Sequence, residues 1–203
     1  ADALKGFESR WQNQTLSDAM AFEYALALEM DGRPQQAGDR LRELASRKPA
    51  LAAETRLAMS EIDERQADWP NVYEILRDYS ESPSPQVTPL LRLTESQINL
   101  ALGLCAMETA RVAREQFPQS SRTIENLARV WEQFGDPEEA LFLLSRPSLL
   151  RGRDTLERTA RLLYRTGRYR AATTFGNANQ LEVPPPPTDA RPNLAPVPAE
   201  RAL

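Results

Sequence analysis

The 203-residue chain contains no histidine, a single cysteine, and lysine only at Lys5 and Lys48. Without histidine it has no imidazole to act as a general acid or base and no catalytic triad of the Ser-His-Asp kind. One cysteine cannot form a disulfide within the chain, and without histidine it cannot complete a Cys/His zinc site. We therefore expect no metal and no cofactor.

An excess of positive charge is also missing, because 25 lysines and arginines are set against 29 aspartates and glutamates, a net charge of −4. A surface that follows nucleic-acid phosphates needs excess positive charge, so we expect no nucleic-acid partner. No apolar run approaches the roughly 18 residues that cross a bilayer, and no signal-peptide pattern precedes the first expected helix. We expect no direct membrane insertion. Because the chain starts at Ala1 rather than at Met, a cytoplasmic and a periplasmic location both remain open.

Two series of residues recur along the chain with one common period. Small residues that open a helical apolar pattern lie 34, 35, 34, 34 and 32 residues apart, at Ala3, Ala37, Val72, Ala106, Ala140 and Ala172. Helix breakers lie 34, 35 and 34 residues apart, at Pro49, Pro83, Pro118 and Gly152. Turn-forming Gly, Asp and Pro precede several of the small residues, which favours a helix end followed by a helix start. The period therefore predicts a series of helical hairpins.

Apolar residues within each unit follow helical spacing, which supports the hairpin interpretation. In the first unit one helix face carries Ala21, Tyr24, Ala25 and Leu28, and the next carries Ala37, Leu41 and Leu44. The third unit has Leu100 and Ala101 where other units have a turn glycine, and Pro147 is expected to end the second helix of the fourth unit early. Cys105, beside Ala106 at a tight helix contact, is expected to be a small buried residue.

This order of features resembles the tetratricopeptide repeat (TPR) family, whose unit is a 34-residue helix-turn-helix. The resemblance implies an all-α fold, a TPR-like right-handed α-solenoid of about five helical hairpins plus an N-terminal helix, with a Pro-rich C-terminal tail. We place the repeat domain at residues 1–181, with a half repeat at 2–14 and repeats at 18–51, 53–86, 87–120, 121–152 and 153–180. Stacking is required because one hairpin cannot bury its apolar face alone.

The two ends of the chain depart from the repeat pattern. The helix at 2–14 is either half of a repeat or a cap on the first hairpin. After Leu181 the composition changes to a run of four prolines, Pro184 to Pro187, with more prolines beyond. Residues 182–203 are therefore expected to form an extended tail or linker. We expect this tail either to act as a spacer or to dock on a partner or on the solenoid.

The family resemblance also indicates where a partner binds, because TPR proteins use the concave surface lined by the first helix of each hairpin. In the first unit this surface is expected to carry the apolar residues Phe22, Leu26 and Met30. The later units add the other candidates, Leu57, Leu91, Arg122, Arg129, Arg161, Tyr164 and Arg165. A groove that grades from apolar to Arg-rich favours a peptide with apolar anchors and acidic residues.

Structural interpretations of the same residues remain open. The apolar residues of the first unit follow helical spacing and can be core side chains. The pairs Glu125/Arg129 and Glu157/Arg161 are four residues apart, which is typical of ion pairs on a solvated helix surface. Phe22 and Leu26 stand where chaperone-binding TPR modules have the Lys and Asn of a carboxylate clamp, so a chaperone co-factor role is not expected.

The predicted function is a non-catalytic scaffold for protein–protein interaction, which binds a peptide or partner subunit on the concave TPR surface within a larger multiprotein complex. The excess of arginine over lysine favours a bacterial source. One alternative is a segment of a periplasmic TPR protein of an envelope or exopolysaccharide-export machine. Another is a helical enzyme domain that uses acidic residues, although no paired carboxylates and no Gly-rich phosphate loop stand out.

Overall fold

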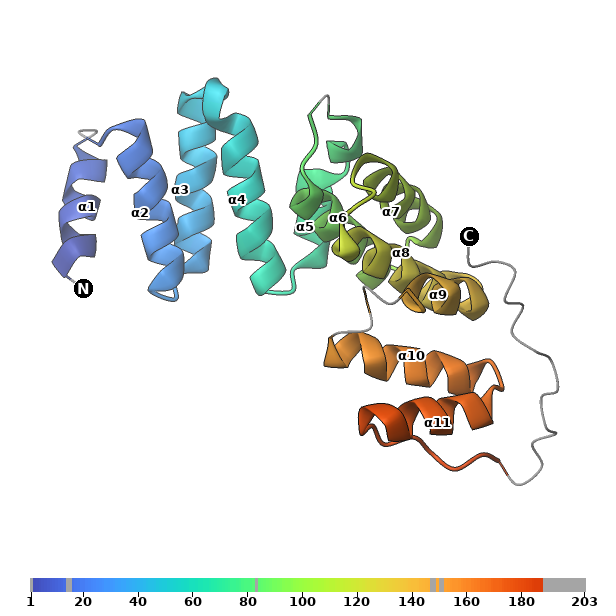
Figure 1. Ribbon diagram of the computed structural model, residues 1–203. Helices are drawn as coiled ribbons and strands as arrows, with labels where there is room; N and C mark the ends of the chain where they lie inside the picture. The colour runs from blue at the N-terminus through green and yellow to red at the C-terminus, as the bar shows by residue number, and fades with distance from the viewer. Residues whose placement is uncertain (1, 14–15, 83, 147–148, 150–151, 188–203) are drawn as a thin grey trace. The chain divides into compact units, whose positions relative to one another are not determined.

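The computed structural model describes residues 2–13, 16–82, 84–146, 149 and 152–187, and within these ranges all regular structure is helical (Figure 1). The chain divides into two compact units, residues 1–113 and 114–203. Residues 188–203, which make up most of the expected Pro-rich tail, lie outside the described ranges.

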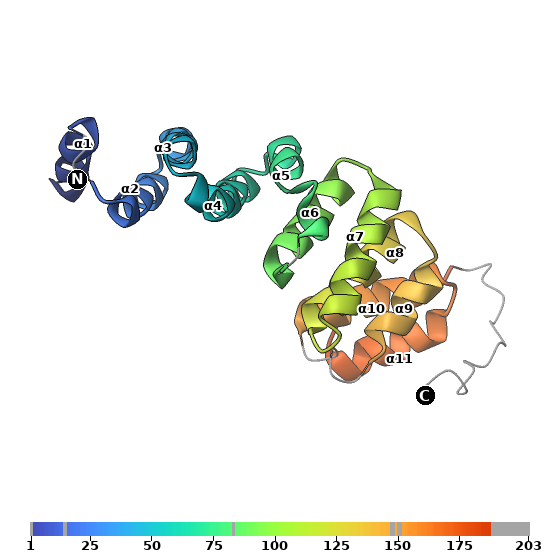
Figure 2. The ribbon, with the colours of Figure 1, turned by 90° about the horizontal axis from the view of Figure 1, so that it is seen from above.

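Helical hairpins follow one another through the first unit. Its α-helices are α1 (Asp2–Gln12), α2 (Asp18–Met30), α3 (Pro34–Arg47), α4 (Ala52–Arg65), α5 (Trp69–Leu76), α6 (Val87–Asn99) and α7 (Gly103–Gln116), whose last turn enters the second unit. Short 3-10 turns at Pro49–Leu51 and Tyr79–Glu81 join the hairpins. Figure 2 shows α1, α3 and α5 in one row and α2, α4 and α6 in the other. The N-terminal helix α1 therefore lies in the row of the second helices.

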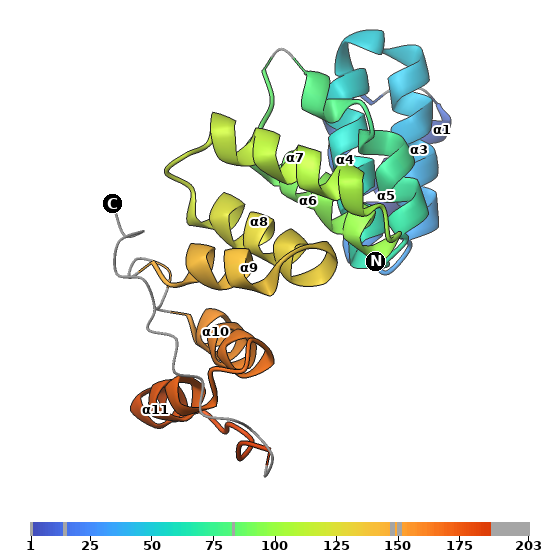
Figure 3. The same ribbon diagram turned by 90° about the vertical axis from the view of Figure 1, so that its right-hand side faces the viewer.

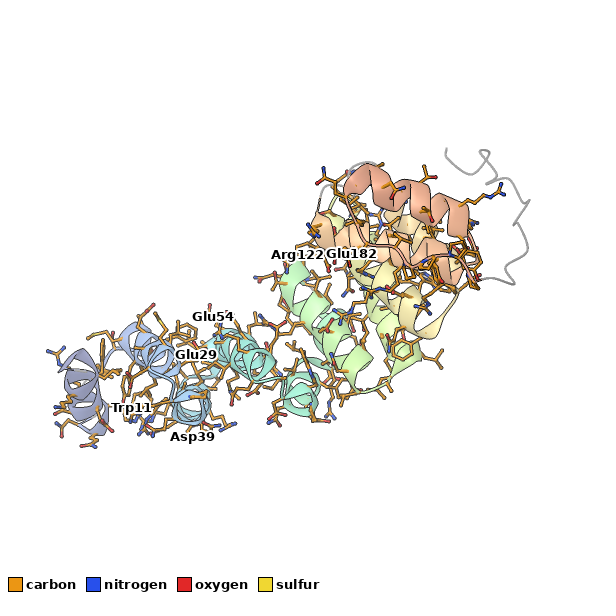
Figure 4. All side chains as sticks on the ribbon, turned by 90° about the horizontal axis from the view of Figure 1, so that it is seen from below. Trp11, Glu29, Asp39, Glu54, Arg122 and Glu182 are labelled. Carbon is orange, nitrogen blue, oxygen red and sulfur yellow. The ribbon has the colours of Figure 1, made fainter. Side chains whose placement is uncertain are left out.

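Aromatic side chains join α1 to the first hairpin. The Phe7 ring stacks on Tyr24 with 5.7 Å between the ring centroids, and the Trp11 ring lies 6.0 Å from Tyr24. The guanidinium carbons of Arg40 and Arg47 lie 5.0 and 5.2 Å from the centroid of the Trp11 ring, within cation–π range. Trp11, labelled in Figure 4, is buried in a cluster that extends through α2 and α3 to Ile62 of α4.

The small residues of the 34-residue series lie at the closest helix contacts. The described members Ala37, Val72, Ala106, Ala140 and Ala172 have no exposed surface. All five lie in the first turn of the second helix of a hairpin, and because they are fully buried a larger side chain has no room there. The periodic small residue is therefore a packing requirement of the hairpin.

The turn inside most hairpins depends on one residue with left-handed backbone. Gly32 and Gly167 have φ of 76°, and the equivalent positions are occupied by Ala67 with φ of 54° and Ala101 with φ of 57°. Glycine adopts this conformation without a steric penalty, whereas alanine pays one. The hairpins α4–α5 and α6–α7 therefore make the same turn as α2–α3 and α10–α11 although they have alanine in place of the turn glycine.

The second unit contains two hairpins in the described residues, shown in Figure 3. Its helices are α8 (Ser121–Phe134), α9 (Pro137–Leu144), α10 (Arg153–Arg165) and α11 (Tyr169–Asn179). Helix α9 ends at Leu144, three residues before Pro147, as the sequence predicted. Beyond α11 the backbone turns back at Gln180, whose φ is 56°, and the amide of Leu181 donates to the carbonyl of Gly176 at 2.9 Å.

The all-α fold of helical hairpins preceded by an N-terminal helix is confirmed. The repeat bounds and the single domain at 1–181 stay predictions. The expectation that Cys105 is buried was wrong, because this residue is exposed. On α7 the buried positions are Ala106, Ala110 and Ala113, spaced as one helix face, and Cys105 lies about 100° around the helix from that face.

Candidate protein-binding surfaces

The first helix of each hairpin, called here a leading helix, carries all ten predicted binding residues, five in each unit. In the first unit the structure divides them between core and surface. Phe22 packs against the cluster around Trp11, and Leu57 packs against a second cluster formed by α5 and α6. Leu26 and Leu91 are half-buried. Only Met30, 86% exposed at the end of α2, presents its apolar side chain fully to solvent.

A small cavity lies beside Leu57 in the first unit. It has a volume of about 270 Å³ and is lined by α4, α5 and the 3-10 turn, through Leu57, Ile75 and Tyr79 among others. Arg56 on one side and Asp78 and Glu81 on the other give it charge of both signs. This volume lies just below the range of about 300–1,000 Å³ that is typical of ligand sites in proteins.

The second unit brings three predicted residues together. Arg161, Tyr164 and Arg165 of α10 line one cavity of about 530 Å³. The opposite wall is formed by residues 180–184, which follow α11. Arg122 and Arg129, on α8, are exposed and lie outside this lining. The cavity therefore has a cationic helix face on one side and extended chain on the other.

The arginines of this cavity differ in their partners. Arg165 lies 3.5 Å from Glu132 of α8, which also accepts from Arg158 at 3.1 Å. Glu157 accepts from Arg153 at 2.8 Å. Arg161 is exposed, and in the described part of the chain no carboxylate lies within ion-pair distance of its guanidinium. Its charge is therefore available to an acidic group of a partner.

Tyr164 connects the two walls of the cavity. Its hydroxyl donates to the carbonyl oxygen of Pro185 at 3.1 Å, and its ring meets the ring of Tyr169 edge-on with 4.9 Å between centroids. Val183 packs against α11 at Gly176, so closely that a Cβ at residue 176 would lie 2.4 Å from Val183 Cγ2. The chain after α11 is thus held on the hairpin at two points.

The sequence left open whether the tail from residue 182 docks on the solenoid, and it did not identify residues 180–184 as a cavity wall. A weak signal for it was present, because Gly176 lies in the interior of α11, where glycine costs helix stability and needs a reason such as a close neighbour. The predicted pair Glu157/Arg161 was also wrong, since Glu157 pairs with Arg153.

Ion pairs join successive leading helices within each unit. Arg65 of α4 lies 2.6 Å from Glu29 of α2, Arg92 of α6 lies 2.6 Å from Glu64 of α4, and Arg158 of α10 pairs with Glu132 of α8. Such pairs fix the position of one hairpin relative to the previous one. Glu29 is labelled in Figure 4. These ion pairs also use up charge that would otherwise face a partner.

Among the described residues, no group of three or more cysteine, aspartate and glutamate side chains is placed to hold a metal ion. None of the described helices combines the length and the apolar character needed to cross a membrane.

No family model and no curated protein matches this chain. Solved structures match its fold. MamA from Desulfovibrio magneticus RS-1 is similar with a TM-score of 0.71 and 12% identity, over 80% of this chain and 93% of that one. PilF from Pseudomonas aeruginosa is similar with a TM-score of 0.63 and 20% identity, over 82% and 77%. Kinesin light chain TPR-like repeats from Podospora anserina match with a TM-score of 0.62 and 16% identity, over 79% and 92%. Together with the 34-residue period and its buried small residues, these matches show that the chain has the fold of tetratricopeptide repeat proteins.

Proposed function

We propose that this protein is a non-catalytic interaction scaffold that holds a peptide or partner subunit against its leading helices, within a larger and bacterial assembly. The cavity on α10 is the main contact site of the second unit. Met30 and the small cavity beside Leu57 supply apolar contacts in the first unit.

The observation that supports this proposal most is the gathering of Arg161, Tyr164 and Arg165 on one cavity of about 530 Å³. The TPR resemblance and the repeat register predict all three residues as positions of a binding face. The volume lies within the range of about 300–1,000 Å³ that is typical of ligand sites in proteins. Arginine and tyrosine are also enriched at the energetic centres of protein interfaces.

The charges of the cavity indicate the partner's chemistry. Arg165 and Arg153 already contact carboxylates of the chain, whereas Arg161 contacts none among the residues that the structure describes. A guanidinium binds a carboxylate through two parallel hydrogen bonds, so Arg161 favours an aspartate, a glutamate or a C-terminal carboxylate of the partner. Tyr164 adds an aromatic face beside it.

The experiment compares two charge reversals on exposed arginines of the same hairpin. Arg161→Glu alters the cavity, and Arg170→Glu on α11 is the matched control outside its lining. A displayed peptide library is selected against the unaltered chain, and the binding of the selected peptides to both variants is measured by fluorescence anisotropy.

We expect acidic sequences among the selected peptides, and a loss of affinity of tenfold or more for Arg161→Glu with little change for Arg170→Glu. Circular dichroism of both variants controls for folding. Equal affinity of the two variants for the selected peptides would show that the cavity is not part of the binding site, and it would contradict the proposal.

A further inference from the structure

The segment after α11 contacts the last hairpin over a longer stretch than the end of a helix requires. We call residues 181–187 the strap. The helix itself is ended by Gln180 in left-handed conformation and by the bond from the Leu181 amide to the Gly176 carbonyl. The contacts at Val183 and Pro185 come after this stop, and Figure 1 shows the chain running back along the hairpin.

The sequence of the strap fixes its conformation. Four consecutive prolines, Pro184 to Pro187, hold φ near −65° and direct the chain into polyproline II. Val183 is also restricted to extended backbone because it precedes a proline. The described strap residues accordingly have no helix or strand. Such a segment loses little conformational entropy when it binds.

The hairpin offers the strap a complementary set of groups. Polyproline II leaves its carbonyl oxygens without internal partners, and the Tyr164 hydroxyl donates to one of them, that of Pro185. The missing side chain at Gly176 leaves a notch on α11, and Val183 occupies it. The edge-on pair of Tyr164 and Tyr169 supplies the aromatic surface on which proline-rich segments commonly dock.

Charge extends the match on the α10 side. Glu182 belongs to the lining of the same cavity as Arg161, whose guanidinium has no ion-pair partner in the described residues. Figure 4 labels Glu182 on the strap beside the last hairpin. A carboxylate one residue before the apolar anchor therefore suits this face, as acidic groups suit the cavity in general.

From these contacts we infer that the face formed by Tyr164, Gly176 and Arg161 is a recognition site for extended proline-rich segments of the type acidic–apolar–Pro-Pro, and that the strap is its occupant in cis. The inference rests on the proposed function and names its class of partner. A partner segment must displace the strap, so the strap is a built-in competitor. Its tethering gives it an effective concentration in the millimolar range.

Two substitutions in the full chain test this inference. One releases the strap so that the recognition site is empty, and the other blocks the recognition site itself. Val183→Asp puts a charge where the apolar anchor packs, so it should release the strap without altering Tyr164, Gly176 or Arg161. Gly176→Ala fills the notch, because the new Cβ would lie 2.4 Å from Val183 Cγ2. Alanine is a better helix former than glycine, so this variant keeps α11.

The probe is a fluorescein-labelled peptide that reproduces residues 180–187, and its binding is measured by anisotropy. We expect the Val183→Asp chain to bind it at least tenfold more tightly than the unaltered chain, whose site is occupied. The Gly176→Ala chain should bind it no better than the unaltered chain. A peptide that itself carries Val183→Asp should not bind any of them. Circular dichroism confirms that the variants fold.

If the peptide does not bind to the Val183→Asp chain, the inference is overturned, and the strap would serve only to end helix α11. Equal binding to the unaltered and Val183→Asp chains would also overturn it, because the strap would then not compete. Neither result would contradict the proposed function. That proposal fails on a different outcome, namely equal affinity of the Arg161→Glu and Arg170→Glu variants for the selected peptides.

Discussion

Arg92 Nε donates to Glu64 Oε2 at 2.6 Å, and the same guanidinium donates to Ser60 Oγ at 3.1 Å. The Arg92 side chain is only 7% exposed. A buried cation is costly unless ion pairs and hydrogen bonds replace its hydration, as they do here between α6 and α4. This ion pair therefore fixes the position of one leading helix on the previous one, and with it the proposed binding surface of the first unit.

Arg92→Ala should destabilise the first unit by about 1–3 kcal/mol, because it removes hydrogen bonds and leaves a cavity between two helices. The matched control is Arg65→Ala. Arg65 pairs with Glu29 at the same distance of 2.6 Å, but its side chain is 48% exposed. An exposed pair contributes less than about 1 kcal/mol. Urea unfolding followed by circular dichroism measures both, and equal losses would show that burial of Arg92 is not what matters.

Ala101→Gly should stabilise the chain by about 0.5–1 kcal/mol. The φ of 57° at Ala101 crowds its Cβ, and glycine relieves that strain at a smaller cost in unfolded-state entropy. The reverse substitution at the equivalent turn, Gly32→Ala, should cost a similar amount, since open space around Gly32 leaves backbone conformation as the main effect. Thermal melting measures the change in Tm of both variants. Changes of the same sign for Ala101→Gly and Gly32→Ala would contradict the shared turn geometry.

Asp63 should make stability depend on pH. Burial and the neighbouring Asp68 carboxylate raise the pKa of Asp63, and Arg42 partly offsets this rise. The folded state then binds the proton more tightly than the unfolded chain does, in which the pKa of an aspartate is about 3.9. Ionisation of Asp63 therefore costs stability, and this cost is present above the raised pKa and disappears as the pH falls to the unfolded value.

Asp63→Asn should accordingly increase the free energy of unfolding at pH 7, and the gain over the unaltered chain should shrink as the pH falls toward 4. Urea titrations at several pH values measure it. A gain that is independent of pH would assign the effect to the amide side chain rather than to the lost charge.

The hairpins were predictable because their cause repeats. Wherever two helices of a hairpin meet, only a small side chain fits, so Ala37, Ala140 and Ala172 mark the same contact in different units. Docking of the tail on the solenoid was one of two alternatives, and the sequence could not choose it, because the reversal after α11 uses Gln180 in left-handed conformation, a residue type that gives no turn signal. The partner of Glu157 could not be chosen either. Arg153 and Arg161 are each four residues away, and only the folded structure selects Arg153.

The packing role of the small residues gives a prediction with a neighbouring control. Ala172 has no exposed surface, whereas Ala171, one position earlier on α11, is exposed. Ala172→Leu adds three carbons where the backbones of α10 and α11 approach, so it should cost about 1–3 kcal/mol. Ala171→Leu adds the same atoms into solvent and should change the free energy of unfolding by no more than a few tenths of a kcal/mol, because leucine and alanine have similar helix propensities. Urea unfolding of the two variants separates packing from composition. Similar costs at both positions would mean that Ala172 is small for some reason other than close approach of the helices.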